Sequence, residues 1–257
     1  MQHSRAQAER ARQWLGGGAR QKAREGPTVD EALRKWELAA LSCAVIKLQR
    51  WAPQSSSGKD ATLAWLRRLG NDVMADYSKY PNRGSRRSNH RYWAAWAATA
   101  AGVAANDRAL YDWGMTGYQV GIDEIQDDGS LPLEVARGSR ALGYHSFALT
   151  PLLMMAETGE ANGQPLYTMK KNRLSLLVRF ILDNFSDPAT LAKLAGAEQD
   201  MGEAIKPSNL VWLEPWYART RDPQAEPWLR DYRPLTHKGA GGDLTMIFGA
   251  PIPESAA

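Results

Sequence analysis

Hydrophobic residues recur at intervals of three and four along most of the chain, which is the spacing of one face of an α-helix. The first such stretch covers residues 31–51, and Pro53 with the serine-rich segment 55–58 ends it. A second stretch, over residues 60–77, repeats the pattern. Both stretches are therefore predicted to be amphipathic helices separated by a short polar connection.

The middle of the chain predicts two further helices with marked N-termini. After a polar loop at residues 82–87, Asn89 stands where an N-cap residue would, and the alanine-rich run HRYWAAWAATAAGVAA follows it. This helix is predicted to be buried on most sides, because its small side chains allow close packing. Asn106 and Asp107 precede another apolar pattern and are expected to cap the next helix.

The second half of the chain continues as helices joined by short loops. A turn is predicted at residues 126–130, and helices are predicted over residues 142–157, 166–184, 188–195 and 210–220, with a break expected at Pro215. The tail after Asp222 is rich in proline and glycine and is predicted to be irregular. With no strand pattern of useful length, repeat or linker, the sequence favours one all-α domain over residues 1–257, built as a bundle or a ring of helix pairs.

Composition places the chain among ordinary globular proteins, since 44% of its 257 residues are hydrophobic and 23% are charged. No apolar run approaches the roughly 18 residues that a membrane-spanning helix needs. The polar N-terminus lacks the apolar core of a signal peptide. The single cysteine, Cys43, excludes an intramolecular disulfide, and its apolar neighbours predict a buried structural residue.

The net charge of +4 and a pI near 9.2 suit an anionic partner, either a nucleic acid or an acidic polymer, although a mildly basic surface without function has the same charge. Zinc-finger spacing, a basic region with heptads and the aromatic RNA-binding motif are all absent, so a nucleic acid is not expected. The ten tryptophans point weakly toward saccharide binding, because sugar rings stack on indoles.

The four histidines do not predict a metal site, because no two of them have the four-residue spacing of helical zinc ligands. His3 and His237 lie in the terminal segments, while His90 and His145 lie in polar-aromatic clusters. His90 follows Asn89 at a predicted helix start. The helix dipole disfavours a cation there, so we expect a neutral imidazole that can accept a proton. A purely structural role for a lone histidine stays open.

A second cluster is formed by Arg137, Arg140 and Tyr144, which are separated by three, four and seven residues. If this stretch is helical, all three side chains lie on one face. Arginine binds carboxylates through a fork of two hydrogen bonds, and a nearby guanidinium stabilises a phenolate. The alternative is a solvated surface with arginines that have no specific partner.

A neutral histidine, an asparagine, arginines and a tyrosine are the groups that β-elimination from a uronate requires. The C5 proton lies next to a carboxylate, which must be neutralised while a base removes the proton and an acid protonates the leaving oxygen. Asp127, Asp128 and Glu134 could instead suggest a glycosidase carboxylate pair, but acids in turns are mostly turn formers. The glycine-rich segments 16–18 and 239–242 lack the Lys-Ser/Thr pair of a phosphate-binding loop.

These clusters resemble ordered sequence blocks of the alginate lyases of polysaccharide lyase family 5. The block SNHRYWAAW at residues 88–96 resembles the family's NNHSYWAAW, and DGSLPLE at residues 128–134 resembles its Gly-x-Leu-Pro-x-Glu turn. Arg137 with RALGYH at residues 140–145 resembles Arg-x-x-Arg-Ala-Leu-x-Tyr-His. The blocks EQDM and WLEP, at residues 198–201 and 212–215, resemble further family segments. The resemblance covers roughly residues 34–248.

The resemblance implies an all-α incomplete toroid, a barrel of antiparallel helix pairs with a cleft. It implies cleavage of mannuronate-rich alginate without a metal or other cofactor. By position, Asn89, His90 and Arg137 would bind and neutralise the carboxylate. Tyr144 would be the acid and, on mannuronate, also the base, whereas His90 would be the base for the opposite epimer. Further substrate contacts are expected from Tyr92, Trp93, Arg140 and His145.

The sequence also departs from the family pattern. Ser88 replaces the first asparagine of the first block, and Phe147 replaces an aromatic residue that is tyrosine in the family. Family members have a longer N-terminal region with a signal peptide and a loop over the cleft, so we expect this chain to lack part of the family domain. The resemblance implies a periplasmic monomer. A non-catalytic binder of acidic polysaccharide and a helical scaffold for nucleic acid remain as alternatives.

Overall fold

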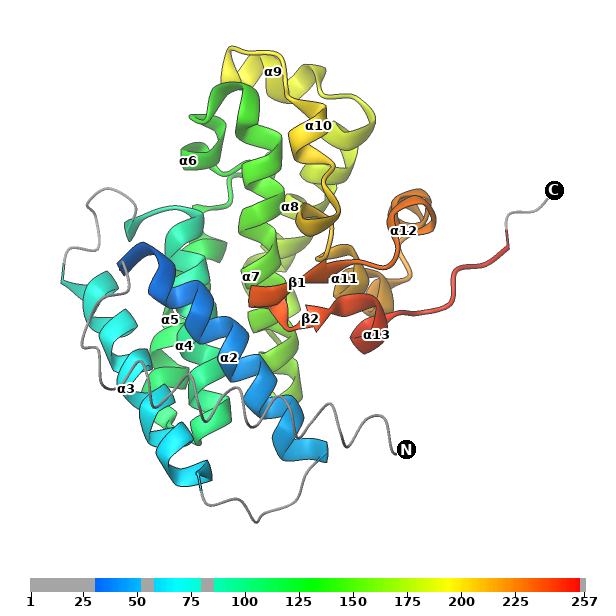
Figure 1. Cartoon of the computed structure of the whole chain (residues 1–257). Coiled ribbons are helices and arrows are strands. Elements are labelled where there is room, and N and C mark those ends of the chain that lie inside the picture. The colour runs from blue at the N-terminus through cyan, green and yellow to red at the C-terminus, as the bar shows by residue number, and fades with distance from the viewer. Residues whose placement is uncertain (1–30, 52–57, 80–85, 255–257) are drawn as a thin grey trace.

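The computed structural model describes residues 31–51, 58–79 and 86–254. Helices dominate these residues, which confirms the predicted all-α class (Figure 1). The α-helices are α2 (Glu31–Trp51), α3 (Lys59–Ser78), α4 (Asn89–Ala105), α5 (Arg108–Glu124), α6 (Pro132–Val135), α7 (Ala141–Ala161), α8 (Met169–Ser186), α9 (Ala189–Ala195), α10 (Met201–Ala204), α11 (Leu213–Thr220), α12 (Glu226–Tyr232) and α13 (Leu244–Phe248). Between them lie the 3₁₀ turns η2 (Gly138–Arg140), η3 (Leu166–Thr168), η4 (Pro207–Asn209), η5 (Pro223–Ala225) and η6 (Lys238–Ala240), and the strands β1 (Thr236–His237) and β2 (Gly242–Asp243).

The boundaries of α2 and α3 follow the hydrophobic periodicity closely. The bounds of α2 match the predicted helix at residues 31–51, and α3 exceeds its prediction by one residue at each end. The break expected at Pro215 does not occur. Proline is tolerated in the first turn of a helix, where its missing N–H group has no carbonyl partner, and α11 begins at Leu213. The predicted connections at Pro53 and at residues 82–85 lie outside the described residues.

Helix α4 lies at the centre of the N-terminal half, and α2, α3, α5 and α7 all pack against it (Figure 1). This arrangement confirms that the alanine-rich helix is buried on most sides. Helices α4 and α5 approach closely because Gly114 and Gly117 on α5 face Thr99 and Ala95 on α4. A Cβ atom at Gly114 would lie 2.0 Å from Thr99 Oγ1, and one at Gly117 would lie 2.4 Å from Ala95 Cβ.

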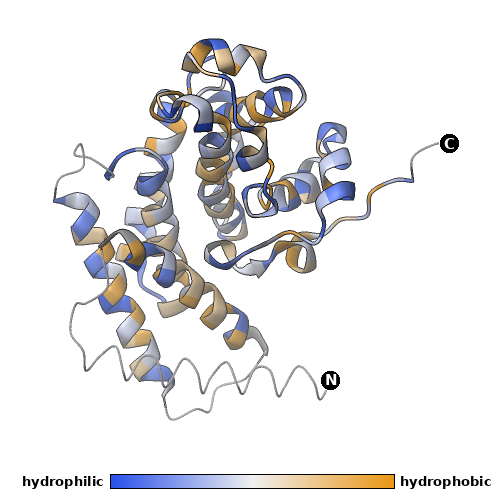
Figure 2. Ribbon diagram, turned by 45° about the horizontal axis from the view of Figure 1, so that its top comes forward, coloured by the Kyte–Doolittle hydropathy of each residue, from blue (hydrophilic) through white to orange (hydrophobic). Residues whose placement is uncertain are grey.

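The outer helices have one hydrophobic face, whereas the central ones are hydrophobic almost all round. Figure 2 shows α3, the leftmost helix of both views, alternating between hydrophilic and hydrophobic residues along its length. Its buried positions, which include Leu66 and Val73, lie on the side that packs against α4. Among the described helices, none has both the length and the apolar character that a bilayer crossing requires.

The prediction of an irregular tail after Asp222 is wrong, because long-range contacts order this segment. Strands β1 and β2 form an antiparallel hairpin in which His237 pairs with Gly242. Arg233, which precedes the hairpin, donates two hydrogen bonds of 2.8 and 2.7 Å to the buried carboxylate of Glu214 on α11. Trp96 on α4 donates a 2.6 Å hydrogen bond to the carbonyl of Gly239. These contacts hold the hairpin between α2 and α7 (Figure 1).

Candidate active site

The site begins at the N-terminus of α4, where the helix lacks a cap of its own. Asn89 is its first residue, so the predicted N-cap position is one residue too late. Ser88 takes that position with φ 62° and makes no side-chain cap. The carboxylate of Glu134, on α6, instead accepts a 2.8 Å hydrogen bond from the Asn89 backbone N–H. A negative group is favourable there because the helix dipole places positive charge at this end.

Glu134 also joins Asn89 to Arg137. The Asn89 Nδ2 atom lies 3.1 Å from each Glu134 carboxylate oxygen. The Arg137 Nε atom lies 3.5 Å from Glu134 Oε2, which is ion-pair distance without hydrogen-bond geometry. Burial raises the pKa of Glu134, and the hydrogen bonds from Asn89 and the charge of Arg137 oppose that rise. A segment 45 residues beyond Asn89 thus connects the two predicted clusters.

Arg137, Arg140 and Tyr144 come together as the spacing predicted. The guanidinium carbon of Arg137 lies 4.7 Å from the centre of the Tyr144 ring, and that of Arg140 lies 5.6 Å from it. The backbone between them is the 3₁₀ turn η2 followed by α7, rather than one continuous helix. Both cations therefore lie against the phenol, and the Arg137 side chain remains 33% exposed and accessible to an anion.

His90 lies beside this cluster as a neutral imidazole. Burial, together with the positive charges of Lys35 and Arg137, lowers its pKa to about 4. The expectation of a neutral His90 therefore agrees with the structure, but burial is the main cause rather than the helix dipole. The ring of Trp36 on α2 packs 5.8 Å from the His90 ring, so α2 forms a wall of the site.

Enclosed polar atoms without a hydrogen-bond partner gather in this region. They include Asn89 Oδ1, His90 Nδ1 and Arg137 Nε. The indole nitrogen of Trp36, whose ring packs on His90, is also enclosed without a hydrogen-bond partner. Buried polar atoms in folded proteins nearly always have partners, so a local group without them is typical of a site that a polar ligand completes.

Three residues that were expected to contact substrate are core residues instead. Tyr92, Trp93 and His145 are at most 1% exposed. Trp93 packs between Phe147 and His237, with ring centres 5.1 and 5.0 Å away. In this structure they have no surface to offer a polymer, because the inner faces of α4 and α7 point into the core. Arg140, by contrast, is exposed.

The buried side chain of His145 has a structural role, because it holds the backbone before α6. Its Nε2 atom accepts a 3.0 Å hydrogen bond from the Leu131 backbone, and its Nδ1 atom lies 2.7 Å from the Ala141 carbonyl. These contacts fix the neutral tautomer with the proton on Nδ1. They also hold the chain just before α6, the helix that carries Glu134.

Acidification is expected to destabilise the fold through these histidines. Burial lowers the pKa of His90, His145 and His237 to about 4 from the ordinary 6.5, so between these values the unfolded chain binds more protons. Stability should be greatest above pH 6.5 and fall as the pH drops toward 4. The fully buried His145 should contribute up to about 1.4 kcal/mol per pH unit.

Urea unfolding at pH 7, 6 and 5 measures this slope. A His145→Gln variant serves as the control, since it should show a smaller loss of stability on acidification than the parent chain. Equal free energies of unfolding at pH 7 and pH 5 in the parent chain would contradict the assignment.

Sequence reasoning missed two residues of this region. By its position in the sequence Glu134 suggests a turn former or a weak glycosidase candidate, yet it is fully buried. The sequence predicts an irregular tail around His237, yet its ring stacks on Trp93 and its Nδ1 atom is enclosed without a partner. Two sequence signals point to the first: Glu134 lies three residues before Arg137, and it ends the DGSLPLE block that resembles the family's Gly-x-Leu-Pro-x-Glu turn. No local pattern indicated the second.

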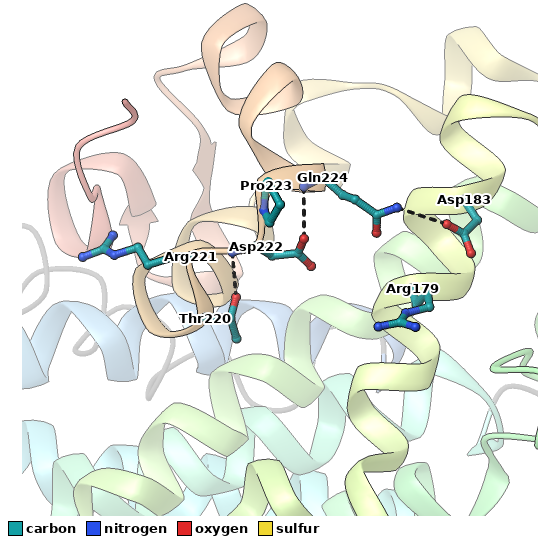
Figure 3. Close-up of a pocket in the computed structure, with 7 residues that line it drawn as sticks. All are labelled: Arg179, Asp183, Thr220, Arg221, Asp222, Pro223 and Gln224. Atoms are coloured by element: carbon teal, nitrogen blue, oxygen red, sulfur yellow. Dashed lines mark hydrogen bonds between the residues drawn. The ribbon is translucent and has the colours of Figure 1, made fainter. Parts of the chain in front are cut away.

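A surface pocket elsewhere holds none of the predicted residues. It has a volume of about 630 Å³ and lies between α8 and the segment after α11 (Figure 3). Its lining consists of Arg179, Asp183, Thr220, Arg221, Asp222, Pro223 and Gln224. Figure 3 shows Gln224 bridging to Asp183, while Arg221 points away from them. Side chains of both charges line this pocket, and none of them belongs to the Glu134 region.

A family model described as alginate lyase matches residues 2–191, which is well over half of the chain. The chain belongs to the alginate lyase family. It is 34% identical over 230 residues to an alginate lyase of Pseudomonas syringae pv. syringae, covering 88% of this chain and 60% of that protein. It is also 34% identical over 252 residues to an alginate lyase of Pseudomonas putida, covering 94% and 67% respectively.

Solved structures of alginate lyase A1-III have the same fold. The enzyme from Sphingomonas species A1 superposes with a TM-score of 0.73 at 27% identity, over 86% of this chain and 62% of that one. A tyrosine-to-phenylalanine variant of A1-III complexed with a tetrasaccharide gives a TM-score of 0.76 at 25% identity, over 87% and 63%. The expected α/α toroid is confirmed. This alginate lyase family chain spans about 60% of the length of the first of these relatives.

Proposed function

We propose that this chain cleaves alginate or a related polyuronate by β-elimination and leaves a 4,5-unsaturated uronate at the new chain end. The observation that carries the proposal is the convergence of Asn89, His90, Arg137 and Tyr144 at one partly enclosed place. Glu134 joins the two halves of this group, and enclosed polar atoms there lack partners. Membership of the alginate lyase family supports the same reaction class.

The reaction requires two proton transfers around one sugar ring. A base removes the C5 proton, the C–H electron pair forms the C4=C5 double bond, and the C4–O4 bond breaks with protonation of the leaving oxygen. Removing the C5 proton increases the negative charge on the adjacent carboxylate, and that charge must be stabilised. Arg137, whose side chain is 33% exposed, supplies a guanidinium group for this purpose. Asn89 is fully buried and its amide donates to Glu134, so it contributes through the Glu134 contact.

Tyr144 is the proton carrier that the geometry favours. On mannuronate, the C5 proton and the O4 leaving group lie on the same side of the ring. One phenolate can therefore take the first proton and deliver it to the second position. The guanidinium groups of Arg137 and Arg140 lie against the Tyr144 ring. His90, held neutral, is the base available for the opposite epimer.

The preference for mannuronate is part of the proposal, as are a periplasmic location and a monomeric state. The tetrasaccharide complexes of A1-III support an oligosaccharide as the partner. The basic net charge of +4 suits such a polyanion.

A uronate panel tests the proposal. The purified chain is incubated separately with polymannuronate, polyguluronate and polyglucuronate, and absorbance in the unsaturated-uronate band is followed. We expect a rise that is fastest with polymannuronate. A folded protein that gives no rise with any polymer contradicts the lyase assignment. Salt-sensitive binding without product would instead indicate a non-catalytic polysaccharide binder.

A further inference from the structure

We propose that Glu134 is a positioning residue of this site, whose buried carboxylate fixes the Asn89 side chain and sets the orientation of Arg137 toward the sugar carboxylate. The kinetic part of this inference rests on the proposed function. Glu134 does not touch the substrate in the proposal, because its side chain is only 1% exposed. It acts through the two residues that it contacts.

The contacts of Glu134 require a group that only accepts hydrogen bonds. The Asn89 backbone N–H, the Asn89 side-chain amide and the Arg137 guanidinium all converge on its two oxygens, at 2.8, 3.1 and 3.5 Å. A carboxylate offers about four acceptor positions and no hydrogens. A glutamine of the same shape would present its own N–H₂ to at least one of these donors.

Glu134 is itself held rigidly. Its backbone N–H donates a 2.9 Å hydrogen bond to the carbonyl of Leu131, and the Leu131 N–H is fixed by the buried His145. These hydrogen bonds therefore hold helix α6, and with it the Glu134 carboxylate, in a fixed position. A carboxylate held in this way also fixes the positions of the Asn89 and Arg137 side chains that it contacts.

The way the other helices are capped shows that Glu134 does more than cap the N-terminus of α4. Helices α5, α10 and α13 are each capped by an aspartate directly before them: Asp107, Asp200 and Asp243. Helix α4 instead starts after Ser88, which forms no cap, and takes its counter-charge from a distant segment. The residue that supplies this charge also pairs with Arg137, so the helix start and the guanidinium are fixed by one group.

Two sides of the Arg137 guanidinium therefore have different neighbours. Its Nε edge faces Glu134 while its carbon lies 4.7 Å from the Tyr144 ring centre. The ends of the guanidinium lie outside the contact with Glu134 and remain available to a carboxylate. Loss of the Glu134 charge should let Arg137 move and leave the α4 N-terminus with an unmatched donor, without removing positive charge from the site.

Glu134→Gln tests the inference. We expect kcat to fall about 100-fold, the loss that a small misplacement of reacting groups produces. KM should change less than about threefold, because the cations that attract the polymer remain. The matched control is Glu124→Gln. Glu124 also accepts a hydrogen bond from α4, through the Tyr92 hydroxyl, but makes no contact with Asn89 or Arg137. It should keep the parent kcat.

A double-mutant cycle separates positioning from a structural role. In an Asn89→Ala background, Glu134→Gln should lower kcat by much less than in the parent chain, because part of what Glu134 positions is already absent. Equal fold-losses in both backgrounds, or an unchanged kcat in the folded single variant, overturn the inference. If Glu134→Gln does not fold, Glu134→Asp replaces it, and an unchanged kcat there has the same meaning.

The parent chain is assayed first, so that the two failures can be told apart. If the parent gives no unsaturated product, the proposed function has failed, and Glu134 is judged by binding of a mannuronate tetrasaccharide in calorimetry. Equal affinity of the parent and Glu134→Gln chains would then overturn the positioning role, and an affinity at least about tenfold weaker in the variant would support it.

Discussion

Tyr144→Phe is expected to lower the rate of unsaturated-uronate formation by about 10³-fold, within the range of 10²–10⁴ that general acid–base groups contribute. Removing one hydroxyl takes away the proposed acceptor of the C5 proton and the proposed donor to the leaving oxygen. The ring itself stays, so its contacts with Arg137 and Arg140 persist. Affinity for a mannuronate oligosaccharide should therefore change less than about threefold. Steady-state absorbance assays and calorimetry measure the two quantities.

The matched control is Tyr111→Phe. The Tyr111 hydroxyl donates a 2.8 Å hydrogen bond to Gln164, away from the Arg137 cluster, so its loss is the same chemical change without the proposed role. We expect near-parent activity from this variant. If Tyr144→Phe retained more than about a tenth of the parent rate, the proton-carrier role would pass to His90.

Glu214→Ala is expected to lower the free energy of unfolding by about 3–5 kcal/mol, the largest stability effect among the predicted substitutions. Glu214 is fully buried and accepts two hydrogen bonds from Arg233 and one of 2.5 Å from the Thr245 hydroxyl. Its removal leaves the guanidinium of Arg233, which is 20% exposed, without its charge partner. The free energy of unfolding in urea measures the loss.

The same change should also reduce activity at temperatures where the chain remains folded. Arg233 precedes the hairpin that carries His237, and the His237 ring packs against Trp93, which lies one helical turn after His90. If the hairpin becomes more mobile, the packing of His237 against Trp93 weakens, and the helix that carries His90 is held less firmly. Asp112→Ala is the control, because it breaks the exposed pair between Asp112 and Arg108. Exposed pairs contribute about 1 kcal/mol or less. A Glu214→Ala loss as small as that would contradict a structural role for the buried pair.

Part of the candidate site could be predicted from local spacing. Arg137, Arg140 and Tyr144 lie within eight residues, so any helical or 3₁₀ backbone brings them close. The prediction held although the segment is not one helix. The connection to Asn89 could not be predicted in the same way. It depends on Glu134, 45 residues further along, and no local pattern states which distant carboxylate meets which helix start.

The roles of the aromatic and histidine residues near the site needed the structure for a related reason. Tyr92, Trp93 and His145 sit in sequence blocks beside the polar cluster, and sequence proximity suggested contact with the sugar. A helix, however, turns successive residues to different sides, so neighbours of a site residue often face the core. Burial of each at 1% or less assigns these three to packing.

The sequence by itself determined the all-α class, the positions of the long helices and the buried, unreactive state of Cys43, whose pKa burial raises to about 12. Those features depend on periodicity and local polarity. Tertiary structure alone decided that the tail after Asp222 is ordered, that Glu134 joins the two polar clusters and that His237 lies against Trp93. Each of these depends on contacts between segments far apart in the chain, which the local sequence pattern does not specify.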